Sequence, residues 1–166
     1  MAKEVRGWDF CDWESLKDQK EIINQLERII ESKYNLRLVP FVRKEAEIAR
    51  KHHLPNPWYY VAHEPDIIFT DGDKPKDRVV LEYVNTKSMF LFDLRGMIAL
   101  SNVYTARRFI LALRHSMYRQ RSFTNLHEKT NVEAMDLKSF LYGLDVSLKE
   151  GNLDYLCDNA VRSTQY

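Results

Sequence analysis

Two acidic residues stand next to the most β-like runs of the chain. Asp66 comes directly before the apolar run 67–70, and Glu82 lies inside the apolar run 79–84. A carboxylate within such a run is costly to bury unless it is paired, protonated or bound to a cation. Two carboxylates and a backbone carbonyl would offer Mg²⁺ the oxygen ligands that it prefers. A cation held there activates water and neutralises charge on a phosphate, so the pair suggests phosphodiester hydrolysis.

The elements around these residues decide whether the two carboxylates can meet. Three β-rich runs follow Pro57, and the turn-rich segment 71–77 separates the last two of them. This pattern predicts a hairpin or meander, which would bring Asp66 and Glu82 together. The predicted strands are residues 58–62, 67–70 and 79–84.

The rest of the chain is predicted to be mainly helical. If residues 36–42 form a strand, that strand lies at a sheet edge, because Pro40 interrupts the run. Residues 107–113 are either a fourth strand or an apolar helical piece, and we favour the strand. The predicted helices are residues 13–33, 44–53, 88–104 and 132–148. The order helix, three strands, helix, strand describes an α/β domain.

Two short motifs resemble a known family. Glu64-Pro65-Asp66-Ile67-Ile68-Phe69 is followed by Val80-Leu81-Glu82-Tyr83-Val84, with 82 − 66 = 16 positions between the acids. Together they resemble the PD-(D/E)xK nucleases, the restriction-endonuclease-like superfamily. The resemblance covers about residues 13–113 and implies an αβββαβ core. It also implies metal-dependent phosphodiester hydrolysis, with Mg²⁺ or Mn²⁺ held by Asp66 and Glu82.

The lysine of that motif is missing. Two positions after Glu82, where the family usually has lysine, this chain has Val84. Lys87 lies three residues further on, and a bend at Asn85-Thr86 would turn its ammonium group toward the phosphate. Without the bend, strand alternation puts Lys87 on the opposite face from Glu82. Migration of the lysine occurs in the superfamily, so Lys87 is the candidate electrostatic stabiliser.

The resemblance also implies a third acidic ligand. A glutamate of the first helix often completes the metal shell in the family, and Glu21 or Glu27 would supply it here. Both flank the apolar stripe of the predicted helix, where solvated glutamates are common. Glu64 has a short reach to the same site.

A basic cluster follows the proposed site. It lies within a stretch without acidic residues, 94–127, and aromatic residues are interleaved with it. Lysine and arginine neutralise phosphates, and aromatic rings stack on unpaired bases. The cluster therefore suggests a nucleic-acid surface, although a solvated or intramolecularly paired surface is an open alternative. Its arginines are Arg107, Arg108, Arg114, Arg119 and Arg121.

Composition sets the class of protein. The 166 residues fit one domain, with a core at about 13–113 and a helical extension at about 130–160. A net charge of +1 gives no argument for nucleic acid by itself. Cys11 and Cys157 match no zinc or redox motif. The opening residues do not resemble a signal peptide, and no run reaches the roughly 20 apolar residues of a membrane span, so we expect a cytoplasmic protein.

Other catalytic templates are not found. The chain has no GxxxxGK loop, GxGxxG or GxSxG motif, and the scattered histidines do not suggest a zinc site. The leading hypothesis is a metal-dependent endonuclease acting on nucleic acid, DNA above all, as a homodimer by family habit. Two alternatives stay open: a non-catalytic nucleic-acid-binding or assembly module, and a protein-binding adaptor. A purely structural interpretation has Asp66 capping a turn, with Glu82 on a solvated edge or paired with Arg107 or Arg108.

Overall fold

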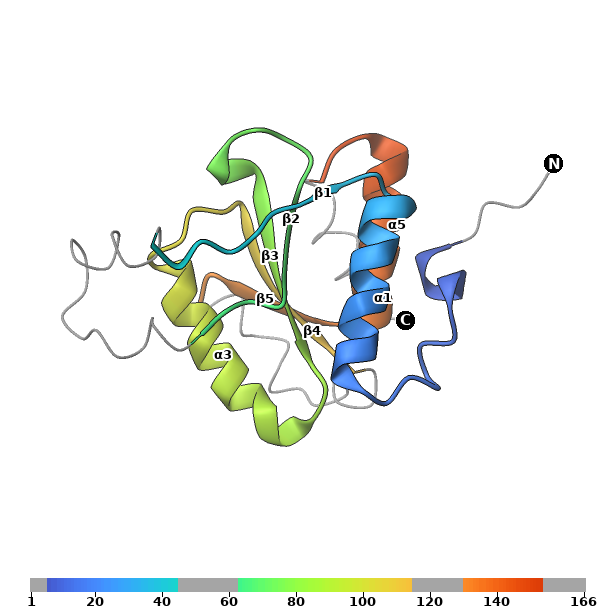
Figure 1. Ribbon diagram of the computed structural model, residues 1–166, viewed down its shortest axis with the longest axis horizontal. Helices are drawn as coiled ribbons and strands as arrows, with labels where there is room; N and C mark the ends of the chain where they lie inside the picture. Colours follow the sequence, from blue (N-terminus) through green and yellow to red (C-terminus); the bar gives the residue numbers. More distant parts are fainter. Residues whose placement is uncertain (1–5, 45–62, 115–129, 154–166) are drawn as a thin grey trace.

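The computed structural model describes residues 6–44, 63–114 and 130–153. Over these ranges the chain forms a five-stranded mixed sheet with helices on both faces (Figure 1). A short 3₁₀ turn, η1 (Gly7–Phe10), precedes the first helix. The sheet is the frame that positions the candidate site.

The strands lie side by side in chain order. They are β1 (Arg37–Leu38), β2 (Ile67–Thr70), β3 (Arg78–Val84), β4 (Arg108–Leu113) and β5 (Val132–Asp136). β1–β2 and β2–β3 are antiparallel, whereas β3–β4 and β4–β5 are parallel. The predicted hairpin of β2 and β3 is confirmed, and the 3₁₀ turn η3 (Pro75–Asp77) lies in its loop.

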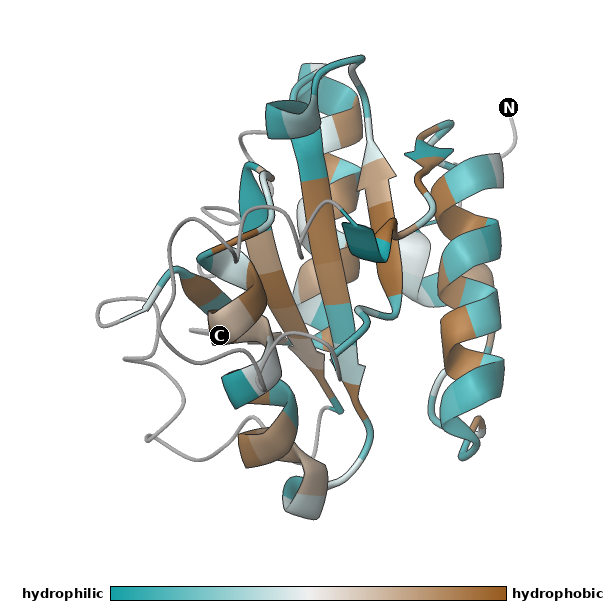
Figure 2. Cartoon of the chain, turned by 60° about the vertical axis from the view of Figure 1, so that its left-hand side comes forward, coloured by the Kyte–Doolittle hydropathy of each residue, from teal (hydrophilic) through white to brown (hydrophobic). Residues whose placement is uncertain are grey.

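Three α-helices in the described ranges cover the sheet. α1 (Gln19–Ser32) and α5 (Leu137–Glu150) lie on one face, and α3 (Lys87–Ser101) lies on the other (Figure 1). α1 turns an apolar stripe toward the sheet and a polar one outward, as the hydropathy colours of Figure 2 show. The apolar residues recur at helical spacing and therefore form one stripe, and burial of this stripe against the sheet stabilises the helix. The stripe consists of Ile22, Leu26, Ile29 and Ile30.

Alternation along β3 divides the hydrophobic core into two clusters. Leu81 and Tyr83 pack in the cluster under α1 and α5. Val80 and Val84 pack in the cluster under α3. Because successive strand residues point to opposite faces, Glu82 points to the α3 side with Val80 and Val84. The α3 face therefore contains the carboxylate that the sequence singled out.

Several predicted elements are confirmed or corrected. The strand over 107–113 is confirmed as β4, and the edge strand within 36–42 as the short β1. The prediction of a helix starting at Val132 is wrong for its first five residues, which form β5 and extend the sheet beside β4. The C-terminal extension is therefore a strand followed by a helix. The predicted strand 58–62 and nearly all of the predicted helix 44–53 lie outside the described residues.

Within the described ranges, no helix combines the length and the apolar character that crossing a bilayer requires.

Candidate functional site

Asp66 and Glu82 are neighbours at one end of the β2–β3 pair. The ladder pairs Ile67 with Leu81, so Asp66 lies one residue beyond it, beside Glu82. The backbone amide of Asp66 donates to Glu82 Oε2 at 3.3 Å, and the amide of Tyr83 donates to Asp66 Oδ2 at 2.8 Å. The hairpin thus brings the two predicted acids together, as the sequence interpretation requires.

The environment of the two carboxyl groups disfavours their charged forms. Burial, followed by repulsion from Glu82, raises the pKa of Asp66 to about 7. Burial, followed by repulsion from Asp93, raises the pKa of Glu82 to about 8. Both carboxyl groups therefore titrate near neutral pH, where adjacent buried carboxylates need a proton or a cation.

Sequence reasoning missed two further members of the site. Asp93 of α3 is only 5% exposed, and burial raises its pKa to about 6. His63, 7% exposed, places Nε2 at 3.3 Å from Glu82 Oε2. Burial lowers the pKa of His63, against the attraction of Asp93 and Asp66. The site thus contains three carboxyl groups and one imidazole, brought from the β2 approach, β3 and α3.

Gly96 makes room for the imidazole. It lies three residues after Asp93 on α3, and a methyl group at this position would overlap the ring of His63. A glycine inside a helix costs about 1 kcal/mol relative to alanine, so its presence here has a packing reason. One face of α3 therefore supplies both a carboxylate and the space for the histidine beside it.

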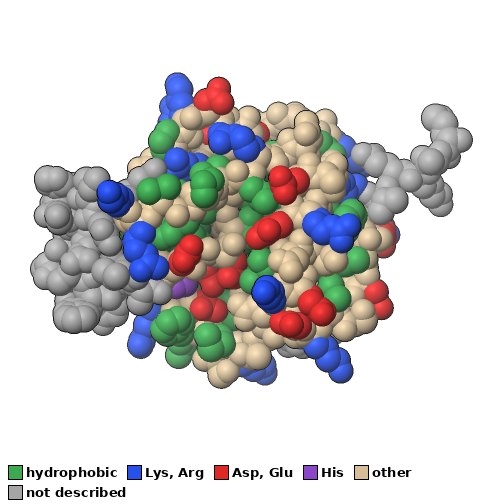
Figure 3. All heavy atoms as spheres, in the orientation of Figure 1, with side chains coloured by type: hydrophobic (Ala, Val, Ile, Leu, Met, Phe, Trp, Pro, Cys, Tyr) green, Lys and Arg blue, Asp and Glu red, His purple; other side chains and the backbone are tan. Residues whose placement is uncertain are grey.

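A pocket adjoins the site on the side of Asp66. Its volume is about 380 Å³, and its lining includes Asp66, Glu64 and Glu27 of α1. Glu64 is exposed and lies 3.9 Å from Arg43. Glu21, the other predicted helix ligand, is exposed in the first turn of α1 and does not line this pocket. Figure 3 shows acidic side chains gathered in the middle of this face, over the strands between α1 and α3.

Val84, at the lysine position of the motif, and Lys87, the candidate substitute, differ in their exposure to solvent. Val84 has no exposed surface and packs in the apolar cluster under α3. Lys87 is exposed at the first residue of α3, directly after the bend at Asn85-Thr86. Six residues separate Lys87 from Asp93, which corresponds to about 120° around a helix. Lys87 therefore does not share the helical face that borders Glu82.

The arginines of the basic cluster are engaged within the fold where they are described. Arg107 lies 3.5 Å from Asp71, and Arg108 lies 3.7 Å from Glu133. Arg114 donates to Asn85 Oδ1 at 3.2 Å and to the carbonyl of Leu16 at 3.3 Å. The first two arginines stand at the start of β4 and the third follows its end, so they do not form one patch. Arg119 and Arg121 lie outside the described residues.

Pairing of Glu82 with an arginine of this cluster receives no support. Arg108 is opposite Val79 in the ladder, three residues before Glu82, and the residue opposite Glu82 is Leu111. Glu82 is also buried rather than on a solvated edge.

The residues fit a divalent cation that brings its own water. Within the described ranges, no group of three or more His, Cys, Asp and Glu side chains is arranged to hold an ion by itself. Mg²⁺ commonly takes one or two carboxylates and completes its shell with water and substrate phosphate. The adjacent carboxyl groups of Asp66 and Glu82, whose pKa values are raised first by burial, have the chemistry for that smaller demand.

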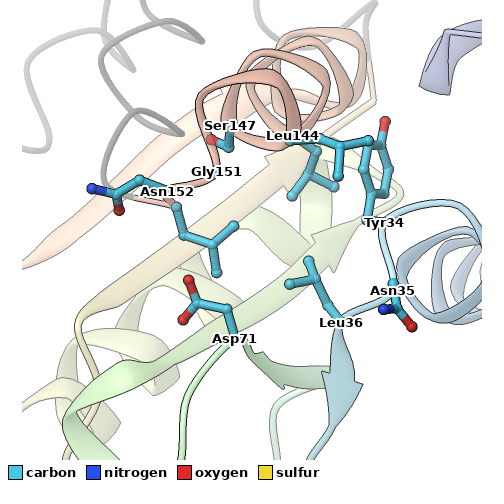
Figure 4. A pocket seen from close by; sticks show the side chains of 10 residues that line it. Tyr34, Asn35, Leu36, Asp71, Leu144, Ser147, Gly151 and Asn152 are labelled. Atoms are coloured by element: carbon cyan, nitrogen blue, oxygen red, sulfur yellow. The ribbon is translucent and has the colours of Figure 1, made fainter.

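A second pocket lies at the other end of the molecule. It has a volume of about 260 Å³ and is formed by the connection between α1 and β1, by the residue after β2, and by the second half of α5 with the residues that follow it (Figure 4). Leu36, Asp71 and Leu144 are among its lining residues. It contains none of the residues that the sequence assigned to the site.

Comparison of the chain with protein-family models, with curated proteins and with solved structures gave no match.

Proposed function

We propose that this protein is a divalent-metal-dependent nuclease of the restriction-endonuclease-like type, with DNA as its main substrate. The observation that carries the proposal is the contact of Asp66 and Glu82, two largely buried acids. Their pKa values are raised to about 7 and about 8, first by burial and then by repulsion from Glu82 and from Asp93, respectively. The element order α1–β1–β2–β3–α3–β4 supports it, because the resemblance implies the same order.

Each residue has a defined part in this proposal. Asp66 and Glu82 hold the cation, which when bound supplies an activated water and neutralises charge on the scissile phosphate. The amide of Tyr83 keeps the Asp66 carboxyl group in place through its 2.8 Å hydrogen bond. Glu27, which lines the adjoining pocket, is better placed than Glu21 to assist through water. Lys87 would act from the start of α3 on a substrate phosphate. By family habit, a homodimer would let one site cut each strand.

The experiment is a cleavage assay on plasmid, single-stranded DNA and RNA with Mg²⁺, Mn²⁺ or chelator. Cleavage that requires the cation and falls at least about 100-fold in both Asp66→Asn and Glu82→Gln supports the proposal. Glu31→Gln is the control, because Glu31 is an exposed acid of α1 that does not line the pocket beside Asp66. Cleavage that survives in both site variants, or none with any substrate and cation, contradicts it.

A second function is favoured by one observation. Val84 fills the usual lysine position with a wholly buried apolar side chain. The alternative is a non-catalytic nucleic-acid-binding or assembly module that keeps the fold without the chemistry. It predicts salt-dependent binding to DNA or RNA with no cleavage by any cation.

A further inference from the structure

The imidazole of His63 has a buried nitrogen atom for which the described residues supply no hydrogen-bond partner. This atom is Nε2, and His63 as a whole is 7% exposed. A buried polar atom of this kind usually has a partner, because leaving it unpaired costs about 1 to 3 kcal/mol. Glu82 Oε2 lies 3.3 Å from His63 Nε2, but the two atoms do not have hydrogen-bond geometry. His63 Nε2 therefore lacks a partner, and Glu82 Oε2, which accepts from the Asp66 amide, has a further lone pair with which it could share one.

We infer that His63 Nε2 and Glu82 Oε2 are adjacent ligands of one first-row transition metal ion. This inference rests on the proposed function and names its cation and an additional ligand. Two ligand atoms that are each about 2.0 to 2.2 Å from one ion lie about 3 Å apart when they are adjacent. The 3.3 Å spacing of this pair is close to that value.

The composition of the site decides the class of ion. Imidazole nitrogen is a good ligand for Co²⁺, Ni²⁺ and Zn²⁺, whereas Mg²⁺ prefers oxygen ligands and water. A purely carboxylate site would discriminate less strongly between these ions. His63 therefore shifts the preference of the site from Mg²⁺ toward transition metal ions.

The surroundings hold the imidazole in place for this role. Its ring packs against Gly96 of α3, where no side chain interferes. Asp93 lies on the same helix, close enough to attract the ring electrostatically. Asp66 is the nearest source of a third ligand, although the Tyr83 amide holds its Oδ2. Its carboxyl group must reorient to join the pair.

Calorimetric titration of the purified full chain with Co²⁺ and with Mg²⁺ tests the inference. We expect Co²⁺ to bind at least about 100-fold more tightly than Mg²⁺. His63→Phe keeps a ring against Gly96 but removes both nitrogens, and it should lose at least about tenfold in Co²⁺ affinity with Mg²⁺ affinity unchanged. Gly96→Ala, which displaces the ring and keeps the ligand, should lower Co²⁺ affinity in the same direction.

The outcomes separate this inference from the proposed function. Equal affinity of the unaltered protein for the two ions, or Co²⁺ affinity unchanged in His63→Phe and Gly96→Ala, overturns the inference. In that case Mg²⁺-dependent cleavage lost in Asp66→Asn would still support the nuclease. Conversely, His63-dependent Co²⁺ binding without any cleavage supports the inference and removes the nuclease. Thermal unfolding of each variant shows whether it is folded, and the two variants alter different elements.

Discussion

Asp145 and Glu82 are two acids that the fold largely shields from water, but different groups surround them. Asp145 of α5 accepts from the Gly7 amide at 3.0 and 3.1 Å and from the Tyr34 hydroxyl at 2.5 Å, with Lys33 at 3.9 Å. Glu82, in contrast, accepts a single backbone hydrogen bond of 3.3 Å within the described residues and faces Asp66 and Asp93.

The difference separates structure from chemistry. The donors around Asp145 compensate its charge and connect η1, the end of α1 and α5, so this acid is part of the scaffold. Around Glu82, in contrast, burial and repulsion from Asp93 disfavour its charged form unless a proton or a cation compensates it. This contrast is the basis of our proposal that the cluster holds a cation.

The largest expected effect breaks the scaffold side of this comparison. Asp145→Ala removes the side-chain acceptor of the Gly7 amide and the shorter of two acceptors of the Tyr34 hydroxyl, so the free energy of unfolding should fall by about 3 kcal/mol. Asp145→Asn keeps an acceptor and should lose less. Urea unfolding measures both, and an unchanged midpoint for Asp145→Ala would show that these bonds do not stabilise the fold.

The next effect is stabilisation of the site by a cation. At a free concentration 100 times its dissociation constant, a bound cation should raise the free energy of unfolding by about 2.7 kcal/mol. This increase in the free energy of unfolding should disappear in the double variant Asp66→Asn/Glu82→Gln, which removes both carboxyl groups. Thermal unfolding with Mg²⁺, Mn²⁺ and Co²⁺ tests this, and an equal rise in the double variant would place the cation elsewhere.

A smaller effect follows from pH. The pKa values of Asp66 and Glu82 are raised in the folded protein, so the folded state binds more protons than the unfolded state between about pH 4 and 8. Without a cation, stability is therefore greatest below pH 4 for these groups and falls as pH rises to about 8. Glu82→Gln should stabilise the protein by about 1 to 2 kcal/mol at pH 8 and by little at pH 4.

Chemical unfolding of the unaltered protein and Glu82→Gln at pH 4, 6 and 8, in chelator, measures this difference. Glu31→Gln, at an exposed acid that does not line the pocket beside Asp66, should show no comparable gain at pH 8. If Glu82→Gln destabilises the protein equally at every pH, Glu82 belongs to the scaffold like Asp145.

The smallest effect concerns Lys87. Its side chain is exposed at the start of α3, so Lys87→Ala should change the free energy of unfolding by less than about 0.5 kcal/mol. It should leave cation affinity unchanged as well. A reduced cleavage rate with normal cation binding would assign it to the substrate phosphate, whereas an unchanged rate would remove it from the site.

The first helix and the β2–β3 hairpin were predictable from the sequence, whereas β5 was not. Regular burial of Ile22, Leu26 and Ile29 made α1 readable, and the turn-rich loop made the β2–β3 hairpin readable. β5 was missed because its residues run without a turn into α5. The available signal was Asp136, which ends the strand and caps the helix by accepting from the Ser139 amide at 2.6 Å.

Half of the site was predictable for a similar reason. Asp66 and Glu82 are tied to neighbouring strands, so a local hairpin is enough to place them together. Asp93 meets them only through the packing of α3 on the sheet, and the ring of His63, from the approach to β2, is placed against Gly96 of the same helix. No short-range pattern encodes this packing. The signal was an acid at Asp93 on the apolar face shared by Phe90 and Met97, followed by Gly96.

The most direct test of the central claim is calorimetric titration with Mn²⁺ at pH 7.5 in two buffers of different ionisation enthalpy. If Asp66 and Glu82 hold one cation between them, one ion binds per chain and protons are released, because both carboxyl groups carry raised pKa values beforehand. Asp66→Asn and Glu82→Gln should each abolish this signal. Binding that persists unchanged in both variants, or that releases no protons, would contradict the claim.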